Sequence, residues 1–283
     1  MDYKIFTSKS RADKAINTLK GITQGILLDE KVTDAELIGL KKWASDNLDI
    51  RNKRAFFEFM LSISEIDLEE VNNRIELVQD IFWLCQKIEQ DGIYYDSFTS
   101  EIQTMIGVFQ GIISDKQIED NEVIGLKYWL LENQHLEGNF IYDKVLSTVL
   151  LILEDGVVDE VERTHLQDIL NEFSLSKQEK PAGSNSILFD HVESIDFESN
   201  VFVLTGEFNF GTRSKLNELI TTKGGLVKSS PSKKTDYVVI GSVGNDAWCY
   251  TRFGRKVEKA LSHREEGFDI KIINENSLMN HLI

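Results

Sequence analysis

The stretch VFVLTGEFNFGTRSKLNELITTKGG (201–225) decides the fold of the C-terminal part of this chain. Its first six residues are β-rich and end at a glycine, as a short buried strand does. Helical spacing follows over residues 212–223, and Gly224–Gly225 supplies the left-handed turn that ends a helix. A second β-rich run, DYVVIG (236–241), repeats the strand pattern. Strands that alternate with helices predict a small parallel sheet with helices on both of its faces.

The pattern of the chain changes at residues 176–186, SKQEKPAGSNS, which are polar and lack apolar periodicity. We interpret this run as a linker. The chain of 283 residues is long enough for about two domains. The sequence therefore predicts an all-helical domain over residues 1–175 and an α/β domain with a four-stranded sheet over residues 187–283.

An internal repeat lies within the helical part. Residues 21–47 and 107–133 align without gaps, and 13 of the 27 positions are identical. Each copy has the pattern of a helix, a turn that begins at an aspartate, and a second helix. Thr33 with Glu36 matches a capping box. Because such a hairpin buries only one face, the copies must pack on each other, which predicts a bundle of roughly seven to nine helices over residues 8–175.

The repeated unit resembles that of the tellurite-resistance TerB-like helical domain, G-x-x-x-D-G-x-hydrophobic-x-x-x-E. The residues that match are Gly25, Asp29 and Glu36, then Gly111, Asp115 and Glu122, then Asp155, Gly156 and Glu162. The first two copies lack the glycine after the aspartate. Some TerB-like domains are described as metal-binding, and Asp29, Asp34 and Glu36 could supply oxygen ligands. An EF-hand would need more ligands and a turn glycine, so we favour helix capping over a metal site.

Residues 201–283 resemble the BRCT fold. The resemblance rests on T-G at 205–206, G-G at 224–225, SKKTDYVV at 232–239 and GRKVEKA at 254–260. It is strongest to the BRCT modules of NAD-dependent bacterial DNA ligases and of the clamp-loader large subunit.

This resemblance implies a phosphate site. In phosphate-binding BRCT modules the first strand ends in a hydroxyl residue and a glycine, which are Thr205 and Gly206 here. A lysine at the start of the second helix, Lys256, and an arginine near the start of the first helix, Arg213, supply positive charge. Charge-assisted donors and helix N-termini suit a phosphate dianion. In the alternative interpretation, Thr205–Gly206 is a tight strand exit and the cations are solvated.

A wider group of residues is predicted to contact a DNA backbone or end. It comprises Lys233, Lys234, Arg252, Arg255 and Lys259, with Tyr250 as an aromatic that could stack on a base. Paired BRCT modules that bind phosphoserine usually carry a threonine where Gly254 stands and a tryptophan in the last helix, which is absent here. These departures favour DNA with a 5′-phosphorylated end or nick over a phosphoprotein.

Charge is distributed unevenly. Residues 187–283 hold 12 Lys+Arg and 13 Asp+Glu, whereas residues 1–186 hold 19 and 34, a net charge of −15. Any contact with nucleic acid is therefore expected in the C-terminal part. The acidic helical part is expected to dock a protein partner.

The sequence lacks a nucleophile–base arrangement, a P-loop and a dinucleotide fingerprint. We therefore expect a non-enzymatic cytoplasmic adaptor without a cofactor or a membrane span, acting in DNA repair, stress or phage defence. Two alternatives stay open: a scaffold that reads a phosphoprotein, and a metal-responsive stress protein.

Overall fold

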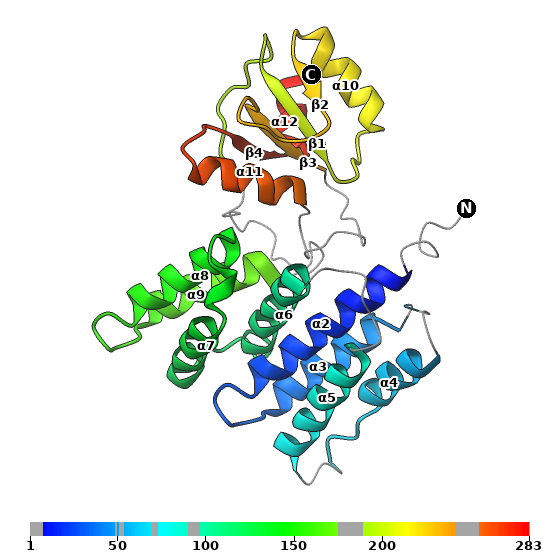
Figure 1. The fold of residues 1–283 in the computed structure, drawn as a ribbon, viewed down its shortest axis with the longest axis vertical. Helices are drawn as coiled ribbons and strands as arrows, with labels where there is room; N and C mark the ends of the chain where they lie inside the picture. Colours follow the sequence, from blue (N-terminus) through cyan, green and yellow to red (C-terminus); the bar gives the residue numbers. More distant parts are fainter. Residues whose placement is uncertain are drawn as a thin grey trace. The chain divides into compact units, whose positions relative to one another are not determined.

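The computed structural model describes residues 8–48, 50, 54–69, 73–89, 97–174, 189–241 and 255–282 (Figure 1). The chain divides into two compact units. The helical unit comprises Met1–Glu137 and Ile141–Ser174, and the C-terminal unit comprises Gly138–Phe140 and Leu175–Ile283. The predicted linker, residues 176–186, lies outside the described residues. The combination of a helical region with an α/β region confirms the predicted fold class.

Eight α-helices occupy the described part of residues 8–174, within the predicted range. The first four are α2 (Ser8–Ile26), α3 (Asp34–Asp46), α4 (Arg54–Ser64) and α5 (Arg74–Glu89). The next four are α6 (Ser97–Ile112), α7 (Asp120–Glu132), α8 (Phe140–Ile152) and α9 (Glu160–Ser174), with the 3₁₀ turn η1 (Gln134–Leu136) after α7. Among the described helices, none combines the length and the apolar character needed to cross a membrane.

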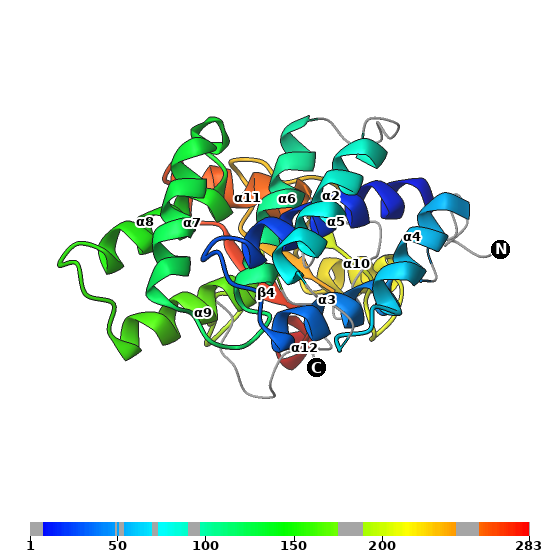
Figure 2. The same cartoon turned by 90° about the horizontal axis from the view of Figure 1, so that it is seen from below.

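Helices α2 and α6 cross in backbone contact, side by side in both views (Figures 1 and 2). A Cβ atom added at Gly21 would lie 1.9 Å from the carbonyl oxygen of Thr104, and one added at Gly107 would lie 2.1 Å from that of Thr18. Real Cβ atoms do not approach backbone so closely, so glycine is required at both positions. These two glycines occupy the same position in the two copies of the repeat.

The two copies contact each other reciprocally. Gly39 of α3 faces Ser114, and a Cβ added at Gly39 would lie 3.3 Å from the Cβ of Ser114. Gly125 of α7 faces Leu28 in the same way, and a Cβ added at Gly125 would lie 3.0 Å from the Cβ of Leu28. Residues 28 and 114 are equivalent under the offset that relates Gly39 to Gly125. The two halves are therefore related by an approximate two-fold axis that passes between α2 and α6.

The symmetry extends beyond the aligned 27 residues. Arg74 of α5 bonds the carbonyl oxygen of Val32 and pairs with Asp34. Arg163 of α9 bonds the carbonyl oxygen of Ile118 and pairs with Asp120, the counterparts of Val32 and Asp34. Each half is thus a four-helix unit in which an arginine of the last helix bonds residues at the start of the second helix.

Capping boxes begin α3, as the sequence predicts, and α9. The backbone N–H of Thr33 donates to Glu36, and the N–H of Glu36 donates back to the threonine hydroxyl. Asp159 and Glu162 exchange the same two bonds at the start of α9.

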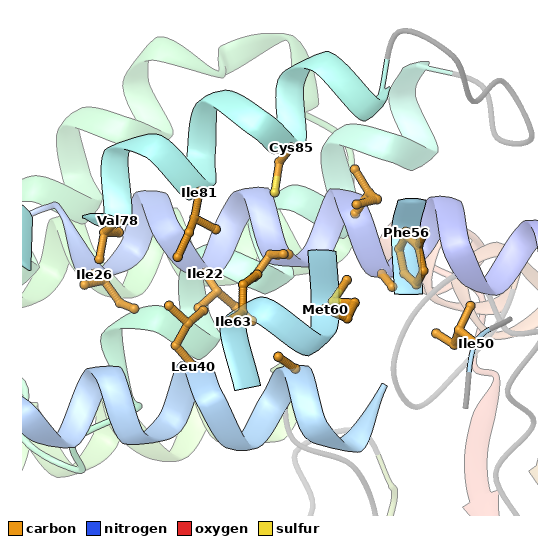
Figure 3. Packing of buried hydrophobic residues seen from close by; sticks show 14 of the residues in the cluster. Ile22, Ile26, Leu40, Ile50, Phe56, Met60, Ile63, Val78, Ile81 and Cys85 are labelled. Carbon is orange, nitrogen blue, oxygen red and sulfur yellow. The ribbon is translucent and has the colours of Figure 1, made fainter. Parts of the chain in front are cut away.

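The four helices of the first half pack around a shared apolar core (Figure 3). Its members include Ile22, Ile26, Leu40, Met60, Ile63, Val78, Ile81 and Cys85.

The C-terminal unit is built on a parallel four-stranded sheet in the order β2-β1-β3-β4. Its strands are β1 (Val201–Thr205), β2 (Leu226–Lys228), β3 (Tyr237–Ile240) and β4 (Lys271–Asn274). Helices α10 (Arg213–Thr222) and α12 (Glu275–Leu282) cover one face and form a core with Phe202, Leu204 and Val239. The alternate residues Val203 and Val238 are buried on the other face, which α11 (Arg255–Glu265) covers (Figure 1).

Candidate phosphate-binding site

The sheet order creates a switch point between β1 and β3. The chain leaves β1 through α10 toward β2 on one side, and it leaves β3 toward α11 and β4 on the other side. In open α/β sheets, ligands bind outside the carboxyl ends of the strands where the connections diverge in this way. The topology therefore directs attention to the residues that follow β1 and β3.

Thr205 and Gly206 lie at this point. Thr205 ends β1, is 5% exposed, and its carbonyl oxygen accepts a 2.8 Å bond from the N–H of Gly241, which follows β3. Among the described residues, no hydrogen bond involves the Thr205 hydroxyl. Gly206 has φ of +87°, a conformation that favours glycine. The chain thus turns sharply and leaves the Thr205 hydroxyl as a donor at the strand exit.

Arg213 closes the loop that begins at Gly206. It is the first residue of α10, capped by the Thr212 hydroxyl, and its Nε and Nη2 donate to the Gly206 carbonyl oxygen over 3.1 and 2.8 Å. These bonds fix the guanidinium beside the turn. Its other N–H groups have no partner in the part of the chain that the structure describes, so they can serve an acceptor from outside.

Lys256 supplies a second cation from the first turn of α11. Burial lowers the pKa of Lys256, and the positive charge of Arg213 lowers it further. Neither cation has a carboxylate partner within the described residues. The structure therefore places Thr205, Gly206, Arg213 and Lys256 at the carboxyl edge of the sheet, where the charge of Arg213 acts on Lys256.

Glu275, which the sequence analysis missed, holds the same loop. Glu275 is 2% exposed, and its carboxylate accepts the backbone N–H groups of Asn209 at 3.1 Å and Phe210 at 2.7 Å. Glu275 begins α12, more than sixty residues along the chain from this loop. Only the three-dimensional arrangement reveals the contact, because nothing in the local pattern at Glu275 signals it.

Two of the predicted DNA contacts, Lys233 and Lys234, lie away from this edge. Lys233 pairs with Glu266 at 2.6 Å and lies over the Phe268 ring. It precedes β3, and Glu266 follows α11, so both lie toward the amino ends of the strands, and Lys234 is exposed in the same turn. The expectation that Lys233 and Lys234 surround the pocket is therefore corrected by the topology, which puts the loop before a strand at the opposite edge.

The remaining predicted contacts have mixed outcomes. Lys259 is exposed on α11, one turn after Lys256. Tyr250 and Arg252 lie outside the described residues, as does the side chain of Arg255. Of these predicted contacts, Lys259 is therefore the one whose side chain the structure describes on the helix that carries Lys256.

The acids weighed as metal ligands have structural roles. Glu36 accepts the capping bonds of Thr33, Asp34 pairs with Arg74, and Asp29 accepts the backbone N–H of Lys31 at 2.9 Å. In the described part of the chain, no group of three or more histidine, cysteine or acidic side chains is arranged to hold a metal ion. These contacts support the capping interpretation.

Glu36 and its counterpart Glu122 are nevertheless unusual. Both are buried, and each lies near acidic side chains of the other half. Burial raises the pKa of Glu122 to about 8, and the nearby charges of Asp115, Asp29 and Glu36 act in the same direction. Burial likewise raises the pKa of Glu36. The interface between the halves therefore holds carboxyl groups that resist ionisation.

Comparison with known proteins identifies the C-terminal unit. Residues 193–275 match the BRCA1 C Terminus (BRCT) domain. A DNA ligase of Endomicrobium trichonymphae is 37% identical over 159 residues, 55% of this chain and 20% of that protein. A DNA ligase of Prochlorococcus marinus (strain NATL1A) is 34% identical over 131 residues, 44% of this chain and 16% of that protein. A DNA ligase of Carboxydothermus hydrogenoformans is 45% identical over 62 residues, 22% of this chain and 9% of that protein.

The chain thus spans a fifth or less of the length of these relatives. The resemblance of the helical unit to TerB-like domains stays a prediction. The order of the strands, the residues at the end of β1 and the matched range all agree. Residues 193–275 of this chain are therefore a BRCT domain related to the BRCT regions of DNA ligases.

Proposed function

We propose that the C-terminal unit binds a terminal phosphate of DNA, at a 5′ end or a nick, and that the chain acts by binding rather than by catalysis. One observation carries this proposal: Arg213 bonds the Gly206 carbonyl oxygen and lies close enough to Lys256 to lower its pKa, and neither cation has a carboxylate partner among the described residues. An arrangement of two like charges is costly when empty and favourable around an anion. A phosphate dianion fits it best, because it can accept bonds from the Thr205 hydroxyl and both cations at once.

Two observations favour DNA over a phosphopeptide. The curated relatives are DNA ligases, and the last helix, ENSLMNHL, lacks the tryptophan of phosphoserine-reading pairs. Lys259, one turn beyond Lys256 on α11, extends the positive charge along the helix. A row of cations beside a single anion site suits a polyanionic strand.

The helical unit is proposed to dock a protein partner. Its acidic charge disfavours nucleic acid. Along α7, Ile124, Tyr128 and Leu131 are exposed and lie on one helical stripe. The equivalent positions 128 and 131 in the first half are Lys42 and Ser45. Ile38, the counterpart of Ile124, is also exposed. The exposed apolar stripe of the second half therefore extends further than that of the first half, as expected where one copy has diverged toward a partner.

The test is equilibrium binding of the full chain to nicked duplex DNA with and without a 5′-phosphate. We expect the parent chain to prefer the phosphorylated nick. Lys256→Ala and Arg213→Ala should each weaken binding to the phosphorylated nick by roughly tenfold or more, because a hydrogen bond to a charged group contributes about 1.5–3 kcal/mol. They should leave the weaker binding to the unphosphorylated nick nearly unchanged.

Lys271→Ala is the matched control, because it removes a cation that pairs with Asp269 at the amino end of β4. It should affect both ligands alike. A phosphoserine peptide as competitor completes the design. Equal binding of both nicks by the parent chain, or displacement of DNA by the peptide at similar concentrations, would reject the proposal.

A further inference from the structure

One large apolar side chain is exposed beside the candidate phosphate site. In the described part of the C-terminal unit, only Phe210, at 46%, and Leu226, at 50%, are large hydrophobic residues with exposed side chains. Leu226 lies on the edge strand β2. Phe210 lies in the loop between Gly206 and Arg213, the two residues that frame the site.

The loop presents Phe210 in a fixed position. The bonds from Arg213 to the Gly206 carbonyl oxygen join its two ends, and Glu275 accepts the backbone N–H of Phe210 itself. Phe208, two residues earlier, packs into the core of the unit. This alternation sends one ring inward and the other outward. The exposure of Phe210 is therefore a property of an anchored loop.

The position of Phe210 relative to the site limits how far a ligand can extend between the anion site and the ring. Its Cα lies three residues from that of Arg213, a separation of at most about 11 Å. An aromatic ring at this distance from an anion site can reach the base of the nucleotide that carries the phosphate. Stacking on aromatic side chains is how proteins hold unpaired bases without reading their sequence.

We propose that Phe210 stacks on the first base behind the bound 5′-phosphate, so that the site takes a nucleotide end with an accessible base rather than a phosphate alone. This inference rests on the proposed phosphate-binding function. It names the class of ligand: a nicked, frayed or single-stranded 5′ end of a nucleic acid. A phosphopeptide offers no planar base at this distance.

The experiment measures binding of the full chain to 5′-phosphorylated oligonucleotides that differ only at their first nucleotide, which carries either a base or an abasic site. We expect Phe210→Ala to lose about tenfold in affinity for the oligonucleotide with the base, since stacking contributes about 1–3 kcal/mol per base. The same variant should bind the abasic oligonucleotide as the parent does. Phe210→Trp should retain affinity, and its fluorescence should be quenched only by the oligonucleotide with the base.

Leu226→Ala is the control, because it removes an equally exposed apolar side chain from the same unit. It should leave both affinities unchanged. If Phe210→Ala loses the same factor on both oligonucleotides, or on neither, the stacking role is wrong. If the parent chain also ignores the 5′-phosphate, the underlying phosphate site is wrong as well, so the two failures can be told apart.

Discussion

The side-chain amide of Asn17 donates a 2.8 Å hydrogen bond to the side-chain oxygen of Gln103, its counterpart 86 residues further along the chain. Both side chains are buried. Because Asn17 lies on α2 and Gln103 on α6, the bond crosses the approximate two-fold axis of the helical unit. A polar pair on this axis fixes the register in which the two halves meet, because sliding one helix along the other would break this buried hydrogen bond.

Gln103→Leu should therefore destabilise the helical unit. The change leaves the Asn17 amide without its acceptor, and an unsatisfied buried polar group costs about 1–3 kcal/mol. Urea unfolding followed by circular dichroism at 222 nm measures the loss. Asn17→Leu combined with Gln103→Leu should cost less than the sum of the single changes. Strict additivity would mean that the pair does not act as a unit.

Gly107→Ala should be, together with Gly21→Ala, one of the two most damaging glycine changes in the described helices of this unit. Its Cβ would meet the backbone of Thr18, which cannot rotate away. We expect a loss of about 3 kcal/mol or more in unfolding free energy, the upper range for overpacking. Gly39→Ala is the comparison, because the nearest neighbour of its Cβ would be the Ser114 Cβ at 3.3 Å, and the nearest backbone atom would lie 3.8 Å away. That variant should be close to neutral.

The stability of the helical unit should fall as pH rises from about 5 to 8. Glu122 has a folded pKa of about 8 against 4.5 in the unfolded chain, so the folded state binds the proton more tightly in this window. The contribution of Glu122 to the free energy of unfolding is then fully present below the unfolded pKa, and it is lost as the pH rises through the folded pKa. The change should be on the order of a few kcal/mol.

Glu122→Gln provides the control for this pH dependence. Its amide oxygen can still accept the bond from the N–H of Glu119, but the group no longer titrates. The midpoint of urea unfolding in this variant should vary much less between pH 5 and 8. The same slope in parent and variant would show that Glu122 is not its source.

Much of the fold could be predicted because its signals are local. The capping box of Thr33 and Glu36 spans only three residues, and the strands of the C-terminal unit are contiguous apolar runs. The repeat was visible as identity, including Gly21 and Gly107. The sequence did not reveal that these glycines touch, because helix periodicity shows which face is buried and not which helix covers it.

The candidate site was predictable only in part, for the same reason. Thr205 and Arg213 belong to one strand–loop–helix segment, so their proximity follows from the local fold. Glu275 reaches the loop from α12, and only the assembled sheet brings it there. Lys233 was predicted to contact the DNA backbone near the pocket, although a residue before a parallel strand lies at the edge opposite to one that follows it.

Thr205→Val tests the hydroxyl in isolation. Valine has nearly the same shape, so the strand should be retained while the donor at its end is lost. We expect the preference for a 5′-phosphorylated nick to fall by roughly tenfold, because a hydrogen bond to a charged group is worth about 1.5–3 kcal/mol. Thr205→Ser should preserve the preference. A valine variant that discriminates as well as the parent would remove the hydroxyl from the site.

The proximity of Lys256 to Arg213 has a chemical consequence of its own. A lysine whose ammonium loses its proton more readily offers more of the neutral amine at physiological pH, and that amine is the form that acylating reagents attack. Lys256 should thus be the most reactive partly buried lysine of its unit toward an activated ester. A bound anion would restore the proton and suppress the reaction, which makes occupancy of the site readable by mass spectrometry.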